Sequence, residues 1–240
     1  MNIKRIGFIL FAVVTLSWTS CDTLQSISNG MGTTSGVLSD TDIISGLKEA
    51  LQVGTSNASG LLNKTDGYFK DPLVKILFPA DAQRAADKLR QLGMGQLVDD
   101  FTMNMNRAAE SAAKEAAPIF VDAIKSMTFA DARNILNGPD NAATEFFKGK
   151  TTAALTAKFS PVISKALDSH NVTKYWRDIT TTYNRIPLVN KVETDLVGYT
   201  TGKALKGLFL KLEGEEKEIR NNPAARVTGL LQKVFGSVKK

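Results

Sequence analysis

Apolar residues recur at helical spacing through almost the whole chain after residue 40. Ile43, Ile44, Leu47 and Leu51 follow one another at intervals that place them on one face of a helix. No segment alternates between apolar and polar residues for long enough to indicate a sheet. The pattern therefore predicts an all-α fold, with a single multi-helix domain over residues 41–240.

Capping residues indicate where several of these helices begin and end. Ser39 or Asp40 can cap the first helix. Thr128 and Asp131 have the spacing of a capping box, which predicts a helix start at that point. Gly93 is expected to end the helix that precedes it.

Prolines are expected to mark the other boundaries, because proline fits the first turn of a helix and breaks its interior. Pro72, Pro161 (with Ser160 as cap) and Pro223 should each begin a helix, and Pro118 should interrupt the long alanine-rich stretch over residues 95–127. In the last helix five apolar residues share one stripe: Val227, Leu230, Leu231, Val234 and Phe235.

Residues 193–222 form the longest helix candidate, and this segment contains several glycines. Gly198 and Gly202 are four residues apart and share a face. Their small size predicts that a neighbouring helix approaches closely there. The same space can alternatively admit the acyl chain of a ligand.

The start of the chain has the layout of a bacterial export signal. Lys4 and Arg5 precede an uncharged run over residues 6–18, and Cys21, the only cysteine, follows two small residues. The run is shorter than the roughly 20 residues that span a bilayer. A membrane anchor and a buried core helix are the alternatives, but a core helix needs a polar face. The segment resembles a lipobox, which predicts a lipid on the Cys21 thiol.

These features predict a lipoprotein-type signal peptide over residues 1–20, and a lipidated Cys21 with a flexible tether rich in Ser, Thr and Gly up to residue 40. A mobile N-terminal extension is the alternative for the tether. The chain would then be anchored in a membrane of the bacterial envelope and face the periplasm. The outer membrane is favoured over the inner one, although Asp22 resembles an inner-membrane retention signal.

The net charge of the chain is small. Loss of Lys4 and Arg5 with the signal lowers the formal net charge from +6 to +4. Such a charge, together with export, argues against a nucleic-acid partner. A single cysteine also excludes an internal disulfide.

The sequence shows no catalytic, metal or cofactor constellation. His170 is the only histidine, and closed metal sites usually need three or four ligands. We interpret it as a residue on the surface or at a helix end. Asp99 and Asp100 are neighbours on a helix and point apart, so they are interpreted as part of a solvated face rather than as an acid/base pair.

Three arginines are candidate contacts for an anion or ligand: Arg133, Arg220 and Arg226. Arginine can clamp a carboxylate or phosphate through two parallel hydrogen bonds, and a helix that begins near Pro223 offers free N–H groups. The alternative is structural. Arg133 would then form a buried or semi-buried ion pair, and the segment around Pro223 would be a corner between two helices with Asn222 as cap.

Two blocks of the sequence resemble a known family. The stretches "DARNILNGPDNAATEFFKGKT" and "EKEIRNNPAARVTGLLQKVFG" are similar to a bacterial family catalogued as domain of unknown function 4197. The similarity extends over roughly residues 42–236. It implies an exported, mostly helical protein of Gram-negative bacteria, and it implies no activity and no catalytic residues.

The sequence therefore leaves two main functions open. The first is a non-enzymatic lipoprotein that binds a partner protein in the envelope. The second is a helical protein with an apolar pocket for a small amphipathic ligand such as a lipid, which its Met and Phe residues would suit. An enzyme with an unrecognised acid/base site is a third, weaker alternative. A large apolar cavity would favour the second function, and a flat apolar surface patch would favour the first.

Overall fold

Helices are the regular secondary structure of the part of the chain that the computed structural model describes, which is residues 39–185, 191–192 and 195–237. No strand occurs in these ranges, so the expected all-α domain is confirmed. Cys21 and most of the expected tether lie outside the described residues. The helices are α2 (Asp40–Leu62), α3 (Gln83–Gln91), α4 (Gly95–Ala112), α5 (Ala116–Lys125), α6 (Phe129–Leu136), α7 (Ala142–Asp168), α8 (Val172–Tyr183), α9 (Leu196–Asn221) and α10 (Gly229–Ser237), with 3-10 turns η1 (Ala80–Ala82), η2 (Ala113–Glu115) and η3 (Pro223–Ala225).

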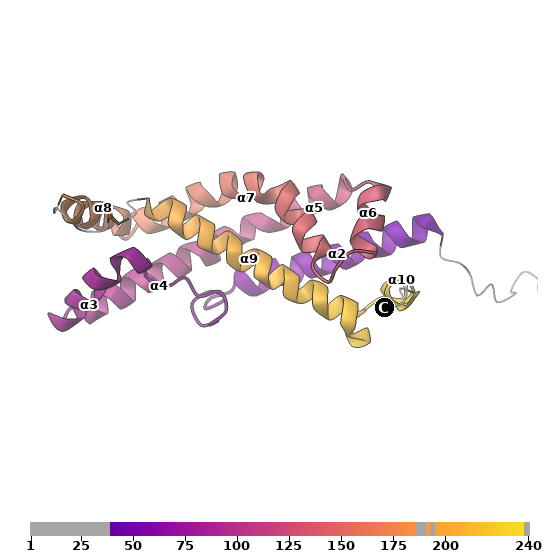
Figure 1. The fold of residues 1–240 in the computed structure, drawn as a ribbon, viewed down its shortest axis with the longest axis horizontal. Helices are drawn as coiled ribbons and strands as arrows, with labels where there is room; N and C mark the ends of the chain where they lie inside the picture. Colours follow the sequence, from indigo (N-terminus) through magenta and orange to yellow (C-terminus); the bar gives the residue numbers. More distant parts are fainter. Residues whose placement is uncertain (1–38, 186–190, 193–194, 238–240) are drawn as a thin grey trace, which may run out of the picture. The chain divides into compact units, whose positions relative to one another are not determined.

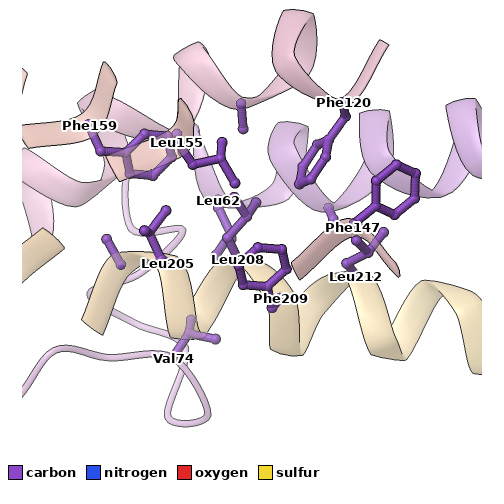
Figure 2. Packing of buried hydrophobic residues seen from close by; sticks show 14 of the residues in the cluster. Leu62, Val74, Phe120, Phe147, Leu155, Phe159, Leu205, Leu208, Phe209 and Leu212 are labelled. Atoms are coloured by element: carbon purple, nitrogen blue, oxygen red, sulfur yellow. The ribbon is translucent and has the colours of Figure 1, made fainter. Parts of the chain in front are cut away.

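The long helix α7 packs along both α4 and α9, and α2 packs against α9, α5, α6 and α10 (Figure 1). The side chains between these helices form one apolar core. Figure 2 shows part of it, with Phe120, Phe147 and Phe209 close to one another. No helix in the described ranges is both long and apolar enough to cross a membrane.

The predicted caps are present. The Ser39 hydroxyl accepts a hydrogen bond from the Asp42 N–H, and the Asp42 carboxylate accepts one from the Ser39 N–H. Thr128 and Asp131 form the same reciprocal pair at the start of α6. Gly93 follows α3 with a φ of +79°, a left-handed conformation that glycine adopts without strain.

The prediction that a new helix begins at Pro161 is wrong, because α7 continues through this residue. A buried ridge with a spacing of four residues runs along the helix and holds it in the core on both sides of the proline. Pro161 and Ala157 are both exposed, so the Ala157 carbonyl, which loses its N–H partner, can bond water instead. The buried ridge consists of Ala143, Phe147, Thr151, Leu155, Phe159, Ile163 and Leu167.

A helix after Pro72 is also absent. Residues 63–79, which we call the strap, connect α2 to η1 without a helix. The Asp71 carboxylate accepts a hydrogen bond from the Leu73 N–H, and the Asp71 carbonyl accepts one from the Lys75 N–H. A single capped turn therefore forms at Pro72 and does not continue as a helix. Val74 and Ile76 are both buried while Leu73 and Leu77 are exposed, so the strap contributes side chains to the core without a helix.

The 3-10 turn η2 interrupts the alanine-rich stretch between α4 and α5, close to the break that was predicted at Pro118. Near the end of the chain, Pro223 opens a 3-10 turn rather than the last helix. Thr228 caps α10 through a hydrogen bond from the Leu231 N–H. Val227 therefore precedes the helix and is exposed, whereas Leu231 is buried as expected.

The close approach expected at Gly198 and Gly202 occurs at other glycines. A Cβ added at Gly202 would meet nothing within 4 Å, and the three atoms nearest to one at Gly198 all belong to Asp195, the cap of its own helix. A Cβ at Gly207 would lie 2.8 Å from Tyr68 Cε1 and 3.2 Å from Val74 Cβ, both in the strap. Gly207 of α9 therefore makes room for the strap and not for a neighbouring helix.

We expect Gly207→Ala and Gly202→Ala to change the stability in opposite directions. Alanine at exposed Gly202 should stabilise the protein by up to about 1 kcal/mol, because glycine is a poor helix former. The same change at Gly207 forces Tyr68 or the strap to move and should destabilise it by about 1–3 kcal/mol. Urea unfolding followed by circular dichroism measures both. A stabilising Gly207→Ala would contradict this packing.

Candidate functional site

A cavity of about 500 Å³ lies among α3, α4, α8 and the end of the strap. Its volume is within the range of about 300–1,000 Å³ typical of small-molecule sites. Figure 1 shows α3 and α8 at the end of the bundle opposite the start of α2. The apolar lining consists of Phe78, Ala82, Ala85, Leu89, Leu97, Val98, Phe101, Val172, Tyr175, Trp176 and Val192, and the polar lining of Asp81, Asp100, Asn104, His170 and Thr180.

Three aromatic rings from three separate segments meet at this cavity. The ring centroids of Phe78 and Phe101 are 5.0 Å apart, those of Phe101 and Trp176 are 5.2 Å apart, and those of Phe78 and Trp176 are 5.6 Å apart. These separations are typical of favourable tilted and edge-to-face contacts. The cluster therefore ties the strap, α4 and α8 together along one wall.

Backbone hydrogen bonds and an ion pair stabilise the turn between α3 and α4. Gly93 supplies the left-handed residue, and the Gly93 and Met94 N–H groups bond to the Arg90 and Leu89 carbonyls. Across the turn, Arg90 Nη2 lies 2.5 Å from Asp99 Oδ1. The two helices thus present Leu89 and Val98 to the same cavity.

A single asparagine closes the segment that follows α8. The Asn184 side-chain amide donates to the Val192 carbonyl at 2.9 Å, and its oxygen accepts from the Val192 N–H at 2.7 Å. This pairing satisfies both backbone groups of a buried residue. It holds Val192 against the cavity, beside the α8 face that carries Val172, Trp176 and Thr180.

The strap reaches the cavity because α4 binds its backbone. The Asn106 side chain accepts from the Ile76 N–H and donates to the Ile76 carbonyl, both at 2.8 Å. Asn106 is fully buried, so the paired bonds replace the hydration that both groups lose. Phe78 follows two residues later and enters the ring cluster.

One turn along α4, Glu110 binds the other end of the strap. Its Oε1 accepts from the Tyr68 and Phe69 N–H groups at 3.1 and 3.2 Å, and its Oε2 pairs with Arg107 at 2.7 Å. The Tyr68 hydroxyl donates to the Ala204 carbonyl of α9. Burial raises the pKa of Tyr68, so this phenol stays protonated and keeps its donor.

The other buried carboxylate, Glu216 of α9, also serves the fold. It accepts from the Ala143 N–H at 2.9 Å and the Thr144 N–H at 2.8 Å, which caps the first turn of α7. Arg220 pairs with it at 2.9 Å and donates to the Ile135 carbonyl at the end of α6. One ion pair therefore joins the ends of three helices.

The three arginines proposed as anion contacts lie away from the cavity lining, and each binds groups of its own chain. Arg133 is exposed and pairs with Asp40 at 3.0 Å. Arg220 is buried in the pair with Glu216. Arg226 donates to the Ile219 and Arg220 carbonyls at the end of α9, where Asn222 caps η3. The contacts of Arg226 and Asn222 have the arrangement of a helix corner, whereas the Arg133 ion pair is exposed and not buried or semi-buried as predicted.

His170 lies between α7 and α8 and is exposed, as expected of a residue at a helix end. The sequence did not reveal that it lines the cavity. Asp99 is exposed and paired, whereas Asp100 is half-buried and lines the cavity, so the two neighbours have different surroundings. The described residues contain no group of three His, Cys, Asp or Glu side chains that could hold a metal ion.

The family match described next covers nearly the same residues as the helical domain. The model of a family described as "Protein of unknown function (DUF4197)" matches residues 37–236. The chain belongs to this family. No curated protein and no solved structure matches the chain. The matched span contains every residue that lines the cavity, so the cavity is built from the part of the chain that defines the family.

Proposed function

We propose that this protein binds a small amphipathic molecule in the cavity among α3, α4 and α8. The observation that carries the proposal is a cavity of about 500 Å³ with eleven apolar and five polar lining residues. Binding sites for small molecules typically have this composition, because apolar surface supplies affinity and a few polar groups fix orientation. Among the two functions that the sequence left open, the cavity favours the pocket protein over docking of a partner protein.

Apolar side chains also continue from the cavity to the surface at the turn between α3 and α4. Leu92, Met94 and Leu97 are 65%, 45% and 47% exposed, and Leu97 lines the cavity as well. Tyr175 of α8 is another exposed lining residue. A rim of this kind gives the tail of an amphiphile an apolar path between the cavity and its surroundings.

The position of Trp176 in the cavity wall allows binding to be followed by its fluorescence. The chain has two tryptophans, so full-length protein with Trp18→Phe keeps only the indole in the cavity wall. We expect the neutral apolar dye N-phenyl-1-naphthylamine to bind at one site per chain and to quench Trp176 by energy transfer. The comparison is between Ala85→Phe, which fills part of the cavity, and Ala153→Phe on the exposed side of α7.

Ala85→Phe should weaken dye binding at least tenfold, whereas Ala153→Phe should bind as the parent protein does. Circular dichroism confirms that each variant is folded. Dye uptake that does not saturate, or equal binding by Ala85→Phe, would rule out this cavity as the binding site.

We also propose that Cys21 anchors the protein by a lipid to the periplasmic face of a bacterial envelope membrane, the outer membrane being favoured. The support is the signal-like segment before Cys21 and its single thiol at the boundary. Stable anchoring needs two or more acyl chains. Metabolic labelling with a radioactive fatty acid should mark the wild-type chain and not Cys21→Ser. Equal labelling of both would contradict the anchor.

A further inference from the structure

The charged residues of the cavity define the kind of head group that fits it. The described lining contains two carboxylates, Asp81 and Asp100, one imidazole, His170, and neither lysine nor arginine. An anionic head group, such as a fatty-acid carboxylate or a phosphate, would therefore face negative charge without a cationic partner in this lining. Binding sites for such anions normally supply arginine or lysine.

Asp81 is exposed and Asp100 is half-buried, and both differ from the carboxylates that lie closer to the core. Elsewhere the negative charges are paired: Asp66 with Lys70 and Arg107, Asp71 with Lys211, Glu110 with Arg107, and Glu216 with Arg220. Within the described residues Asp81 has no hydrogen bond or ion pair, and Asp100 accepts one hydrogen bond, from the Gln96 side chain at 2.7 Å. Neither carboxylate of the cavity thus forms an ion pair with a cation in the described part of the chain.

The field of Asp81 is felt by a neighbouring phenol. Burial and then the negative charge of Asp81 raise the pKa of Tyr199. The Tyr199 hydroxyl donates to the Leu77 carbonyl of the strap at 3.1 Å, so its donor is used there and not on Asp81. A cation placed beside Asp81 would be stabilised by the same charge.

The aromatic lining points to the same sign of ligand charge. Phe78, Phe101, Tyr175 and Trp176 all line the cavity, and the faces of aromatic rings are electron-rich. They attract alkylammonium groups and are the usual partners of quaternary ammonium ions. Carboxylates and aromatic rings together form a recognition set for a cation attached to an apolar chain.

We infer that the ligand of this cavity is an amphiphile with a cationic, alkylammonium head group. This inference rests on the proposed function. The apolar chain lies among Ala85, Leu89 and Val98, and the ammonium group is held by Asp81 and Asp100. Long-chain carboxylates and anionic phospholipids are selected against by the same two residues.

Three probes that share a twelve-carbon chain test the head group: dodecyltrimethylammonium, dodecanoate and 1-dodecanol. Each competes with N-phenyl-1-naphthylamine for full-length protein with Trp18→Phe, below micelle-forming concentrations. We expect the ammonium probe to displace the dye at an about tenfold lower concentration than dodecanoate, with 1-dodecanol between them. Tenfold corresponds to about 1.4 kcal/mol, as expected from two partly exposed charge contacts. The preference should diminish with added salt.

The double variant Asp81→Asn/Asp100→Asn should lose most of this preference while its affinity for 1-dodecanol stays unchanged. The matched control is Asp87→Asn/Asp122→Asn, which removes two exposed carboxylates outside the lining and should keep the preference. Equal displacement by the ammonium and carboxylate probes, or a preference that survives in the cavity variant, overturns the inference while dye binding still supports the proposed function. If the dye itself does not bind, both fail together.

Discussion

The binding of the strap by two polar side chains of α4 is the interaction on which this end of the molecule depends. Residues 63–79 cross the helices without secondary structure of their own, so their buried N–H and C=O groups need partners. Asn106 supplies both partners for Ile76, and Glu110 accepts from Tyr68 and Phe69. Because these residues are four apart on one helix, a single face of α4 fixes both ends of the strap.

The cavity follows from this arrangement. The strap delivers Phe78 to Phe101 and Trp176, while its other residues fill the space that Gly207 leaves on α9. Elsewhere α4 packs closely on α7, and its residues Met105, Ala108 and Ala109 belong to the core. The N-terminal half of α4, beside the turn with α3, lines the cavity. Tight packing in the middle of the bundle and an open end are thus produced by the same helix.

Much of the fold could be predicted from local sequence signals. Caps such as Ser39 and the Thr128–Asp131 pair act through neighbours three residues away, so their effect is visible in the sequence itself. Pro161 shows the limit of such signals. Its meaning depends on whether the freed Ala157 carbonyl is solvated and on the buried ridge that continues to Leu167, and both are tertiary facts. The prediction of a helix after Pro72 failed for a similar reason, since Asn106 and Glu110 bind the strap from a distant helix.

The cavity was beyond sequence reasoning for another reason. Its wall combines Phe78, Phe101 and Trp176, and each of these lies in a segment that looks like an ordinary stretch of core in the sequence. Asp100 was interpreted with Asp99 as a solvated face because nothing in the sequence distinguishes the two. Only the packing of α8 against α4 and the strap separates them. The abundance of Phe and Met suggested a pocket in general but gave no position for it.

Hydrogen exchange of individual backbone amides tests most directly whether α4 orders the strap. In nuclear magnetic resonance spectra, the Tyr68, Phe69 and Ile76 amides should exchange as slowly as amides in the core of α7, although they lie in no helix. The neighbouring N–H of exposed Leu77 donates a hydrogen bond to no described group, so it should exchange rapidly. If the Ile76 amide exchanges as fast as that of Leu77, the strap is not held by Asn106, and the account of the cavity wall is contradicted.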